Sequence, residues 1–249
     1  ITAALTAAER GMQVELWEKR NVLGGLLLAA GGPSFKKDVK DYVDFLVQKL
    51  HRSTVKVSLM KDGSAEEILR GNYDKVIFAT GATPVMPPIK GIDQSWVVGA
   101  NDLLTSKKSY GKKVVVVGAG LVGCETACHA AQSAESVTMI EMLPEILMTT
   151  SHSKNNDQAL RQLIQDSKVE AITSAKVLAF ENGMVVYEKD GKKHTIEADT
   201  VAIAAGYKAN TVLYDQLSDK IDCALVGDAE NPDNILSAVH HGYHAVRCI

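Results

Sequence analysis

Two kinds of hydrophobic pattern alternate along the chain. Short runs made mostly of apolar residues occupy residues 14–17, 74–79, 113–117, 137–140, 200–205 and 223–227. Such runs are typical of parallel strands that are buried on both faces. Between them, apolar residues at helical spacing predict helices over residues 1–10, 36–50, 155–165 and 236–246. This alternation predicts an α/β fold built on parallel sheets.

A third pattern interrupts the alternation before residue 200. Residues 176–180, 184–189 and 194–196 read as short strands, separated by Glu181-Asn182-Gly183 and by Asp190-Gly191. Both separators carry the turn chemistry of antiparallel hairpins. We therefore expect a small antiparallel insert ahead of the strand at 200–205.

The run of valines at 114–117 leads directly into a glycine motif, GxGxxG, at residues 118–123. Gly118 suits a tight turn, Gly120 a backbone close to a pyrophosphate, and Gly123 close packing of helix on strand. Glu141 ends the next strand, 23 residues after Gly118, where an acid binds an adenosine ribose. An ordinary glycine-rich turn is the alternative, and the strand, helix and acid favour a dinucleotide site. Beyond Glu141 no arginine lies nearby to bind a 2′-phosphate, which favours NAD over NADP.

The first 18 residues repeat the segment that follows this motif. When Glu18 is aligned with Glu141, small residues coincide without a gap, and Ile1 falls on Cys124. The repeat predicts a second nucleotide unit, whose first strand and glycine loop would come immediately before residue 1. In that unit, the paired glycines Gly24 and Gly25 suit a backbone near a ligand or an ordinary loop.

Near the end of the chain, a buried run ends in Gly227-Asp228, and Asn234-Ile235 begins a helix. An aspartate at a strand end can accept a sugar hydroxyl, and a helix N-terminus stabilises an anion. Together they suit the ribityl chain and the N1–C2=O edge of a reduced flavin. A capped strand–loop–helix without a ligand is the alternative.

Composition narrows the class of protein. The 249 residues suffice for two modest domains, and a net charge of −3 gives no indication of a nucleic-acid or membrane partner. The four cysteines form no CxxC pair, which indicates a reducing, cytoplasmic setting and argues against disulfide reduction. No residue stands out as a catalytic acid or base, and no cluster suggests a metal site.

The segments VIFATGATP, VVVVGAGLVGCETA and ALVGDAENPDNILSAVHHGYHA resemble one family. It is the FAD/NAD region of the NADH:flavin oxidoreductases, relatives of 2-enoate reductase, 2,4-dienoyl-CoA reductase and trimethylamine dehydrogenase. The resemblance implies two Rossmann-like, three-layer dinucleotide-binding domains of the flavin disulfide reductase-like type, the NAD domain inserted in the FAD domain. We expect residues 1–88 and 208–249 to bind FAD, or ADP alone, and residues 89–207 to bind NAD.

The resemblance also assigns site residues. Expected at the FAD site are Glu18, Lys19, Gly24, Gly25, Thr80, Gly81, Gly227, Asp228, Asn234 and Ile235. Expected at the NAD site are Gly118, Gly120, Leu121, Val122, Gly123, Glu141 and Gly206.

The family implies a larger protein, in which an N-terminal barrel carries FMN and a [4Fe–4S] cluster. NADH would reduce FAD in the present region, and electrons would pass through the cluster and FMN to an activated C=C bond. Two alternatives stay open: a structural module that holds ADP or NAD, and a stand-alone FAD reductase that serves a separate carrier. The implied partners are NADH and the barrel, with homo-oligomerisation left open.

Overall fold

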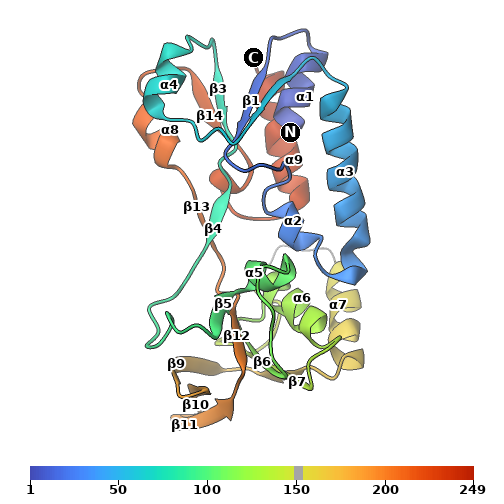
Figure 1. The fold of residues 1–249 in the computed structure, drawn as a ribbon, viewed down its shortest axis with the longest axis vertical. Helices are drawn as coiled ribbons and strands as arrows, with labels where there is room; N and C mark the ends of the chain where they lie inside the picture. The colour runs from blue at the N-terminus through green and yellow to red at the C-terminus, as the bar shows by residue number, and fades with distance from the viewer. Residues whose placement is uncertain (149–153) are drawn as a thin grey trace. The chain divides into compact units, whose positions relative to one another are not determined.

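The apolar runs form strands and the helically spaced runs form helices, in the order that the sequence predicts (Figure 1). A computed structural model describes residues 1–148 and 154–249. Contacts divide the chain into two units, each made of segments that are separated in sequence. Unit 1 comprises residues 1–28, 38–83 and 208–249, and unit 2 comprises residues 29–37 and 84–207. The α/β fold class is confirmed.

A five-stranded parallel sheet forms the centre of unit 2. In spatial order its strands are β5 (Val97–Gly99), β12 (Thr200–Ile203), β6 (Lys113–Val117), β7 (Ser136–Ile140) and β8 (Glu170–Ile172). Strand β6 lies in the middle, and its four valines are all buried. They alternate between two apolar clusters, one on each face of the sheet. This is why a continuous apolar run, rather than an alternating one, marks the strand in the sequence.

Different layers cover the two faces of this sheet. On the face of Val114 and Val116 lie α5 (Ala100–Leu104), α6 (Leu121–Ala130) and α7 (Lys154–Asp166). The opposite face packs against an antiparallel sheet of β9 (Ala175–Glu181), β10 (Met184–Lys189) and β11 (Lys192–Glu197). Both hairpin turns have positive φ at two residues, Asn182-Gly183 and Asp190-Gly191, as mirror-image turns require. The expected antiparallel insert is therefore confirmed.

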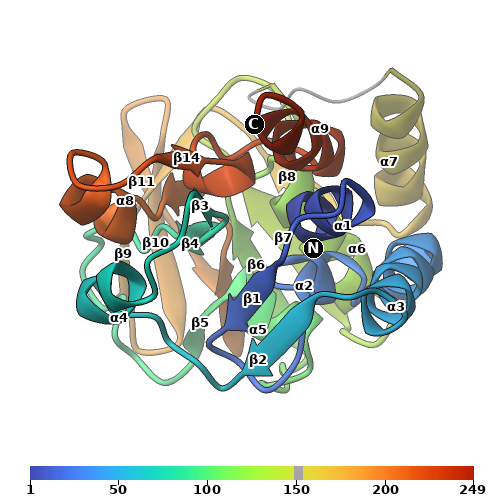
Figure 2. The same cartoon turned by 90° about the horizontal axis from the view of Figure 1, so that it is seen from above.

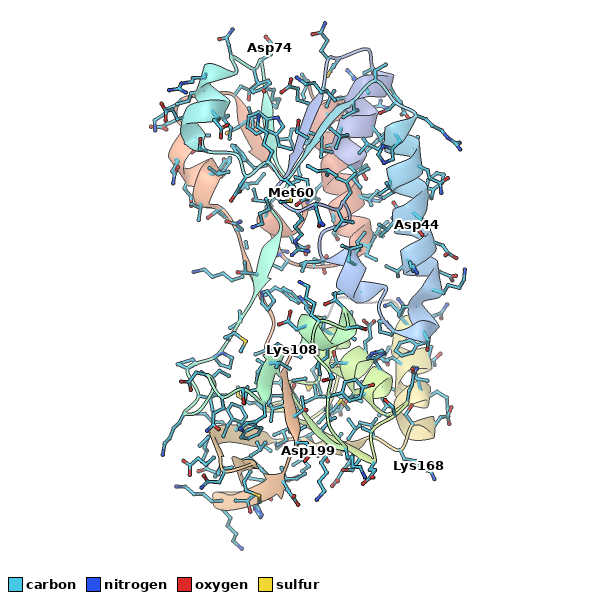
Figure 3. All side chains as sticks on the ribbon, in the orientation of Figure 1. Asp44, Met60, Asp74, Lys108, Lys168 and Asp199 are labelled. Atoms are coloured by element: carbon cyan, nitrogen blue, oxygen red, sulfur yellow. The ribbon has the colours of Figure 1, made fainter. Side chains whose placement is uncertain are left out.

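Asp199, labelled in Figure 3, holds the start of β6 in place. Its carboxylate oxygen Oδ2 accepts hydrogen bonds from the backbone N–H groups of Lys112 and Lys113, each at 2.8 Å. A Cβ on Gly111 would lie 2.4 Å from the Cβ of Asp199, so only glycine fits there. The basic stretch before β6 is thus tied to the turn before β12.

Unit 1 contains two separate pairs of parallel strands (Figure 2). Strand β1 (Glu15–Glu18) pairs with β2 (Lys56–Leu59), and β3 (Val76–Phe78) pairs with β14 (Cys223–Leu225). One apolar cluster joins β1 and β2 to α1 (Thr2–Glu9) and α3 (Lys37–His51). A second joins β3 and β14 to α4 (Ala65–Arg70) and α8 (Val212–Leu217), and α9 (Ile235–Arg247) packs along α1.

Short elements complete the chain. They are α2 (Leu27–Ala30), the 3₁₀ turns Ser34–Lys36 and Gly227–Ala229, and the strands β4 (Ala82–Pro84) and β13 (Tyr207–Ala209). Strand β4, which ends in Pro84, pairs with β13. A proline is tolerated there because the pair has only two strands and an unpaired edge needs no N–H donor.

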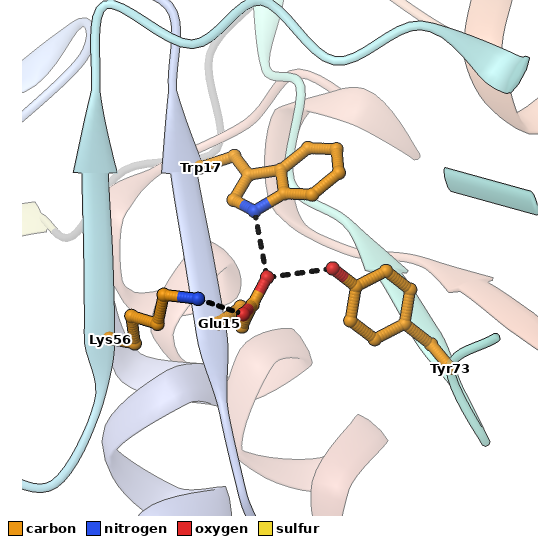
Figure 4. A network of polar contacts seen from close by, with 4 residues as sticks. All are labelled: Glu15, Trp17, Lys56 and Tyr73. Atoms are coloured by element: carbon orange, nitrogen blue, oxygen red, sulfur yellow. Dashed lines mark hydrogen bonds and ion pairs between the residues drawn. The ribbon is translucent and has the colours of Figure 1, made fainter. Parts of the chain in front are cut away.

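A polar network surrounds the carboxylate of Glu15 on β1 (Figure 4). It accepts hydrogen bonds from Lys56 Nζ at 2.6 Å, from the Tyr73 hydroxyl at 2.7 Å and from Trp17 Nε1 at 3.3 Å. The bond from Lys56, followed by that from Tyr73, lowers the pKa of Glu15 to about 2. Burial and the bond to Glu15 raise the pKa of Tyr73 to about 12.

Acid should weaken unit 1 through Glu15. Its pKa lies below the ordinary 4.5, so the folded state gains from the ionised form above pH 4.5 and loses that gain as the pH falls toward 2. Urea unfolding of the protein and of Glu15→Gln should differ at pH 6, and the difference should shrink below pH 4.5. Glu66→Gln, which breaks an exposed pair with Arg70, serves as the control. A difference that stays constant from pH 6 to pH 2 would contradict the role given to Glu15.

Candidate nucleotide sites

The glycine turn of unit 2 follows β6 and leads into α6. Gly118 has φ +99°, and a Cβ on it would lie 2.5 Å from the carbonyl oxygen of Ala204. A Cβ on Gly123 would lie 2.0 Å from the carbonyl oxygen of Gly118. Both positions therefore require glycine, as the sequence predicts.

The start of α6 is open to an anion. Its N-cap is Gly120, which has no side chain to accept a hydrogen bond from the first turn. The N–H groups of Leu121, Val122 and Gly123 consequently receive no side-chain cap, and the positive end of the helix dipole lies there. These backbone groups fit the pyrophosphate of a dinucleotide.

Glu141, which directly follows β7, is held against this turn. Its Oε2 accepts a hydrogen bond from the Ala119 N–H at 2.6 Å, and its Oε1 accepts one from the Leu143 N–H at 2.9 Å. A carboxylate has about four acceptor positions, so two remain for the hydroxyls of a ribose. The residues of unit 2 therefore fit the adenosine and pyrophosphate parts of NAD.

Glu18, the last residue of β1, accepts the same kind of local backbone hydrogen bond as Glu141. Oε1 of Glu18 accepts a hydrogen bond from the N–H of Arg20 at 2.8 Å, as Glu141 does from Leu143. In both units the donor lies two residues after the acid. The shared bond gives the sequence repeat a structural counterpart, and it fixes each carboxylate at the carboxyl end of its strand.

The two units also share a residue with a left-handed backbone, which the sequence does not predict. Met60 after β2 and Ser174 after β8 both have left-handed backbones, with φ +57° and +52°. The N–H of Met60 binds the carbonyl of Arg20 at 2.9 Å, and that of Ser174 binds the carbonyl of Leu143 at 2.9 Å. The next N–H in each case binds the carbonyl of the acid itself, at 3.0 and 2.8 Å. Methionine and serine carry no sequence signal for this conformation, which is why pattern analysis misses them.

Four further residues predicted for unit 1 lie in two turns. Gly24 and Gly25 follow β1, with φ +118° and +55°, and a Cβ on Gly24 would lie 3.0 Å from Val43 Cγ1. Thr80 and Gly81 follow β3, where the Thr80 hydroxyl donates a hydrogen bond to the Asn210 carbonyl at 2.6 Å. Gly81 has φ +69°. Lys19, next to Glu18, is exposed.

The segment after β14 contains the last predicted group. Gly227 has φ +62°, and the Asp228 carboxylate accepts a hydrogen bond of 3.4 Å from the Asp233 N–H. Asn234 is the N-cap of α9, where its Oδ1 accepts from the Ser237 N–H at 2.9 Å. Ile235 is the first residue of that helix.

Removing this cap should loosen the start of α9. Asn234→Ala deletes the acceptor for one first-turn N–H, and we expect a loss of about 1 kcal/mol in the free energy of unfolding. Urea unfolding followed by circular dichroism would measure it. Asn234→Ser keeps an acceptor and should stay near the parent value. Equal losses in the two variants would contradict the capping role.

The structure thus gathers the predicted residues into two groups. The predicted residues of unit 2 lie at or just after the carboxyl ends of β6, β7 and β12. The predicted residue beyond β12 is Gly206, whose φ is +94°. Those of unit 1 lie at the carboxyl ends of β1, β3 and β14 or follow them. Ligands of open parallel sheets bind at this edge. The individual roles of these residues remain predictions.

Residues 29–37, which the sequence assigns no role, attach to α6 in unit 2. Lys36 Nζ lies 2.5 Å from Oε1 of Glu125, whose side chain is only 11% exposed. Gln132 Nε2 donates a hydrogen bond to the Ser34 hydroxyl at 2.8 Å. A Cβ on Gly32 would lie 2.0 Å from the carbonyl oxygen of Leu104. This segment therefore depends on a half-buried ion pair and a close backbone contact.

Lys36→Met should destabilise unit 2 by roughly 2 kcal/mol, because the nearly buried Glu125 carboxylate loses the ammonium group with which it forms an ion pair. Thermal unfolding of the single variant and of Lys36→Met with Glu125→Leu would measure it. The double variant should recover part of the loss, because it removes the uncompensated charge. A single variant as stable as the parent protein would show that the pair is not stabilising.

The cysteines do not form a redox pair. All four are free, and Cys124 and Cys128 are buried in α6. Burial raises the pKa of Cys124 to about 12 and that of Cys128 to about 11. Both therefore stay protonated near neutral pH, where a thiol is a poor nucleophile.

Within residues 1–148 and 154–249 no group of three His, Cys, Asp or Glu could hold a metal ion. The same residues include no helix with the length and apolar character that a membrane span requires.

Comparison with known proteins gives consistent matches. The family model described as pyridine nucleotide-disulphide oxidoreductase matches residues 1–228. The chain is 34% identical to cinnamate reductase from Clostridium sporogenes, over 99% of this chain and 37% of that protein. It is 38% identical to NADH oxidase from Thermoanaerobacter brockii, over 97% of this chain and 38% of that protein.

A solved structure supports the same conclusion about the fold. The 2-naphthoyl-CoA reductase in complex with 2-naphthoyl-CoA superposes with a TM-score of 0.92 at 27% identity. The match covers 100% of this chain and 38% of that one. The chain therefore spans well under half the length of the relatives that it matches.

Proposed function

The chain belongs to the pyridine nucleotide-disulphide oxidoreductase family, and we propose that it is the module of a flavin ene-reductase that oxidises NADH. This family binds FAD and NAD(P)H. In the proposed reaction, unit 2 would hold NADH as the hydride donor and unit 1 would hold FAD as the hydride acceptor. The electrons then leave through further cofactors of a longer protein, an iron–sulfur cluster and FMN in a barrel, to an activated C=C bond.

The observation that carries the proposal is the pair of matching acid turns. Glu18 and Glu141 each end a parallel strand, and each accepts a hydrogen bond from the N–H two residues later. One such turn suits one adenosine ribose. Two in one chain therefore favour two nucleotides, which a hydride transfer between cofactors needs.

The protein's own residues would position the reactants. Glu141 and the glycine turn would hold the adenosine and pyrophosphate of NADH, which fixes where the nicotinamide can reach. Glu18 would bind the ribose of FAD, and Asp228 its ribityl chain. The N-terminus of α9 would stabilise negative charge on the reduced flavin. A bound FAD would supply the hydride acceptor, so no side chain would have to act as an acid or base.

The cysteines favour an electron acceptor other than a dithiol in this chain. Cys124 and Cys128 are buried with raised pKa values, and Cys223 and Cys248 are free. Disulfide reduction needs a reactive thiolate next to the flavin. Relatives named for cinnamate and for 2-naphthoyl-CoA support an enoate-type acceptor for the complete protein.

An anaerobic titration tests the proposal. The protein is reconstituted with FAD and titrated with NADH while the flavin absorbance is followed. We expect the absorbance band of the oxidised flavin to bleach as NADH is consumed. A flavin that keeps its absorbance while NADH stays unbound would exclude the proposed reaction.

A structural nucleotide-binding module is the second candidate. The described residues of unit 1 contain no counterpart of the Gly118–Gly123 turn, which motivates this alternative. Such a module would bind ADP or NAD and not reduce flavin. Binding of ADP with no bleaching by NADH would favour this candidate.

A further inference from the structure

Helix α9 carries two histidines on the side that faces away from α1. Gly242 lies against α1, because a Cβ built on it would lie 3.3 Å from the backbone nitrogen of Ala3 (Figure 2). His240 and His244 lie two positions before and two positions after Gly242. Two positions correspond to about 200° around an α-helix, so both imidazoles project away from α1. Both histidines are accordingly exposed.

The two imidazole rings lie next to each other on this side of the helix. Their centroids are 6.0 Å apart, and the ring planes are at 83° to each other. Among residues 1–148 and 154–249, no hydrogen bond or ion pair engages either ring. The neighbouring His241 differs, since its Nδ1 lies 3.1 Å from Oε2 of Glu230. In the described part of the chain, His240 and His244 are therefore the imidazoles of α9 whose nitrogen atoms are free to bind a ligand.

The charged residues on the neighbouring turns are engaged elsewhere. Arg247, three positions after His244, donates a hydrogen bond from Nη1 to the Tyr243 hydroxyl at 2.9 Å. Its guanidinium group also lies 5.6 Å from the centroid of the Tyr243 ring. At the start of the helix, Asp233 Oδ2 accepts a hydrogen bond from the Ser237 hydroxyl at 2.6 Å. Neither charged group is bonded to the histidine pair, which leaves the pair open to a ligand.

The spacing of the pair matches what a shared metal ion requires. Residues at positions i and i+4 of a helix lie one above the other on the same face. With metal–nitrogen distances of about 2.0–2.1 Å, two imidazole rings bound to one ion at about 90–109° have centroids about 4.5–5.2 Å apart. The observed separation of 6.0 Å is about 1 Å larger. Rotation about the side-chain bonds closes this difference, because exposed side chains exchange rotamers rapidly.

We propose that His240 and His244 bind one divalent transition-metal ion, of the class of Ni²⁺, Cu²⁺ and Zn²⁺, through one nitrogen atom of each ring. Imidazole is a good ligand for these ions, whereas Mg²⁺ and Ca²⁺ prefer oxygen ligands. Water fills the remaining positions, because the pair is exposed and no third His, Cys, Asp or Glu side chain joins it among the described residues. The ion links two successive turns, so its binding stabilises the folded conformation of α9.

Calorimetric titration of the protein with NiCl₂ tests the site. We expect His240→Asn and His244→Asn each to weaken Ni²⁺ binding by at least about ten-fold, because only one imidazole of the chelate remains. His51→Asn removes an exposed histidine at the end of α3, and this control should bind Ni²⁺ like the parent protein. An excess of MgCl₂ should not displace Ni²⁺. Unchanged affinity for Ni²⁺ in both α9 variants would overturn the proposal.

Cys248, four positions after His244, offers a competing arrangement. Its thiol is free and exposed, and a thiolate is also a ligand for these ions. Cys248→Ser distinguishes the two arrangements and should bind Ni²⁺ like the parent protein. A loss of binding in Cys248→Ser, together with unchanged binding in His240→Asn, would overturn the proposal and assign the ion to His244 and Cys248.

An NMR measurement on the parent protein makes the test independent of how well the variants fold. Paramagnetic Ni²⁺ bound to the pair should broaden the amide signals of residues 240–244, while the signal of His51 stays sharp. Urea unfolding should show a higher midpoint with Ni²⁺ in the parent protein and no such shift in His240→Asn or His244→Asn, because the ion binds only the folded pair. Equal broadening at His51, or an equal midpoint shift in the two variants, would show non-specific binding and overturn the site.

Discussion

Gly118→Ala should abolish tight NADH binding and destabilise unit 2 by roughly 3 kcal/mol. Two effects add at this position. A left-handed backbone costs a residue with a Cβ about 1–2 kcal/mol, and here φ is +99°. The new Cβ would also lie 2.5 Å from the Ala204 carbonyl oxygen, at the end of β12, so the turn must move away from the sheet. We expect the Kd for NADH to rise at least about ten-fold, since the turn places the N-terminus of α6.

Gly183→Ala is the matched control. Gly183 also has positive φ, +75°, yet nothing lies within 4 Å of a Cβ built on it, and it is in a hairpin of the antiparallel insert. That variant should lose only about 1 kcal/mol and keep its affinity for NADH. Urea unfolding and NADH titration measure both quantities. If the two variants bind NADH equally well, the tight turn at Gly118 is not needed for the nucleotide.

Glu141→Gln should raise the KM for NADH by roughly ten- to a hundred-fold. A hydrogen bond to a charged group is worth about 1.5–3 kcal/mol, and glutamine replaces the charge with a neutral amide. The carboxylate accepts from two backbone N–H groups, those of Ala119 and Leu143, and the amide can accept through only one of its two atoms. The variant should therefore bind the ribose more weakly and hold its side chain in place less well.

The same variant tests the preference for NADH over NADPH. The Glu141 carboxylate would repel the 2′-phosphate of NADPH. Replacing it with a neutral amide should therefore lower the ratio of the rate with NADH to the rate with NADPH. Steady-state rates with both nucleotides at equal concentration give that ratio. Glu135→Gln is the control, since the Glu135 side chain is 62% exposed and forms an ion pair with the exposed Lys112. Faster turnover of the parent protein with NADPH would contradict the use of Glu141 as the determinant.

The sequence predicts the strands that have neighbours on both sides better than the edge strands. The valine run of β6 and the run of β12 are apolar throughout because both faces are covered, and both were predicted. Strands β5 and β8 lie at the two edges of the same sheet and have only three residues each. Short edge strands leave no continuous apolar run, so the sequence does not reveal them.

Local contacts of the site could be predicted only where a residue type is required. Gly118 and Gly123 were predicted because a Cβ cannot fit, and Glu141 because an acid follows the strand. The left-handed backbone conformation of Met60 and Ser174 could not be predicted, since hydrogen bonds to distant residues impose it. The pair of Lys36 and Glu125 joins positions 89 residues apart, and no local pattern encodes it.

The interleaving of the two units has a consequence for the order of folding. Apart from residues 29–37, unit 2 is one continuous segment, so most of its contacts can form as soon as residue 207 has been synthesised. Strand β3, in contrast, waits for β14, and the paired residues Val76 and Cys223 are 147 positions apart (223 minus 76). Closing so long a loop is slow, and it is cheaper when a folded segment already brings its ends together. We therefore expect unit 2 to fold before β3 pairs with β14.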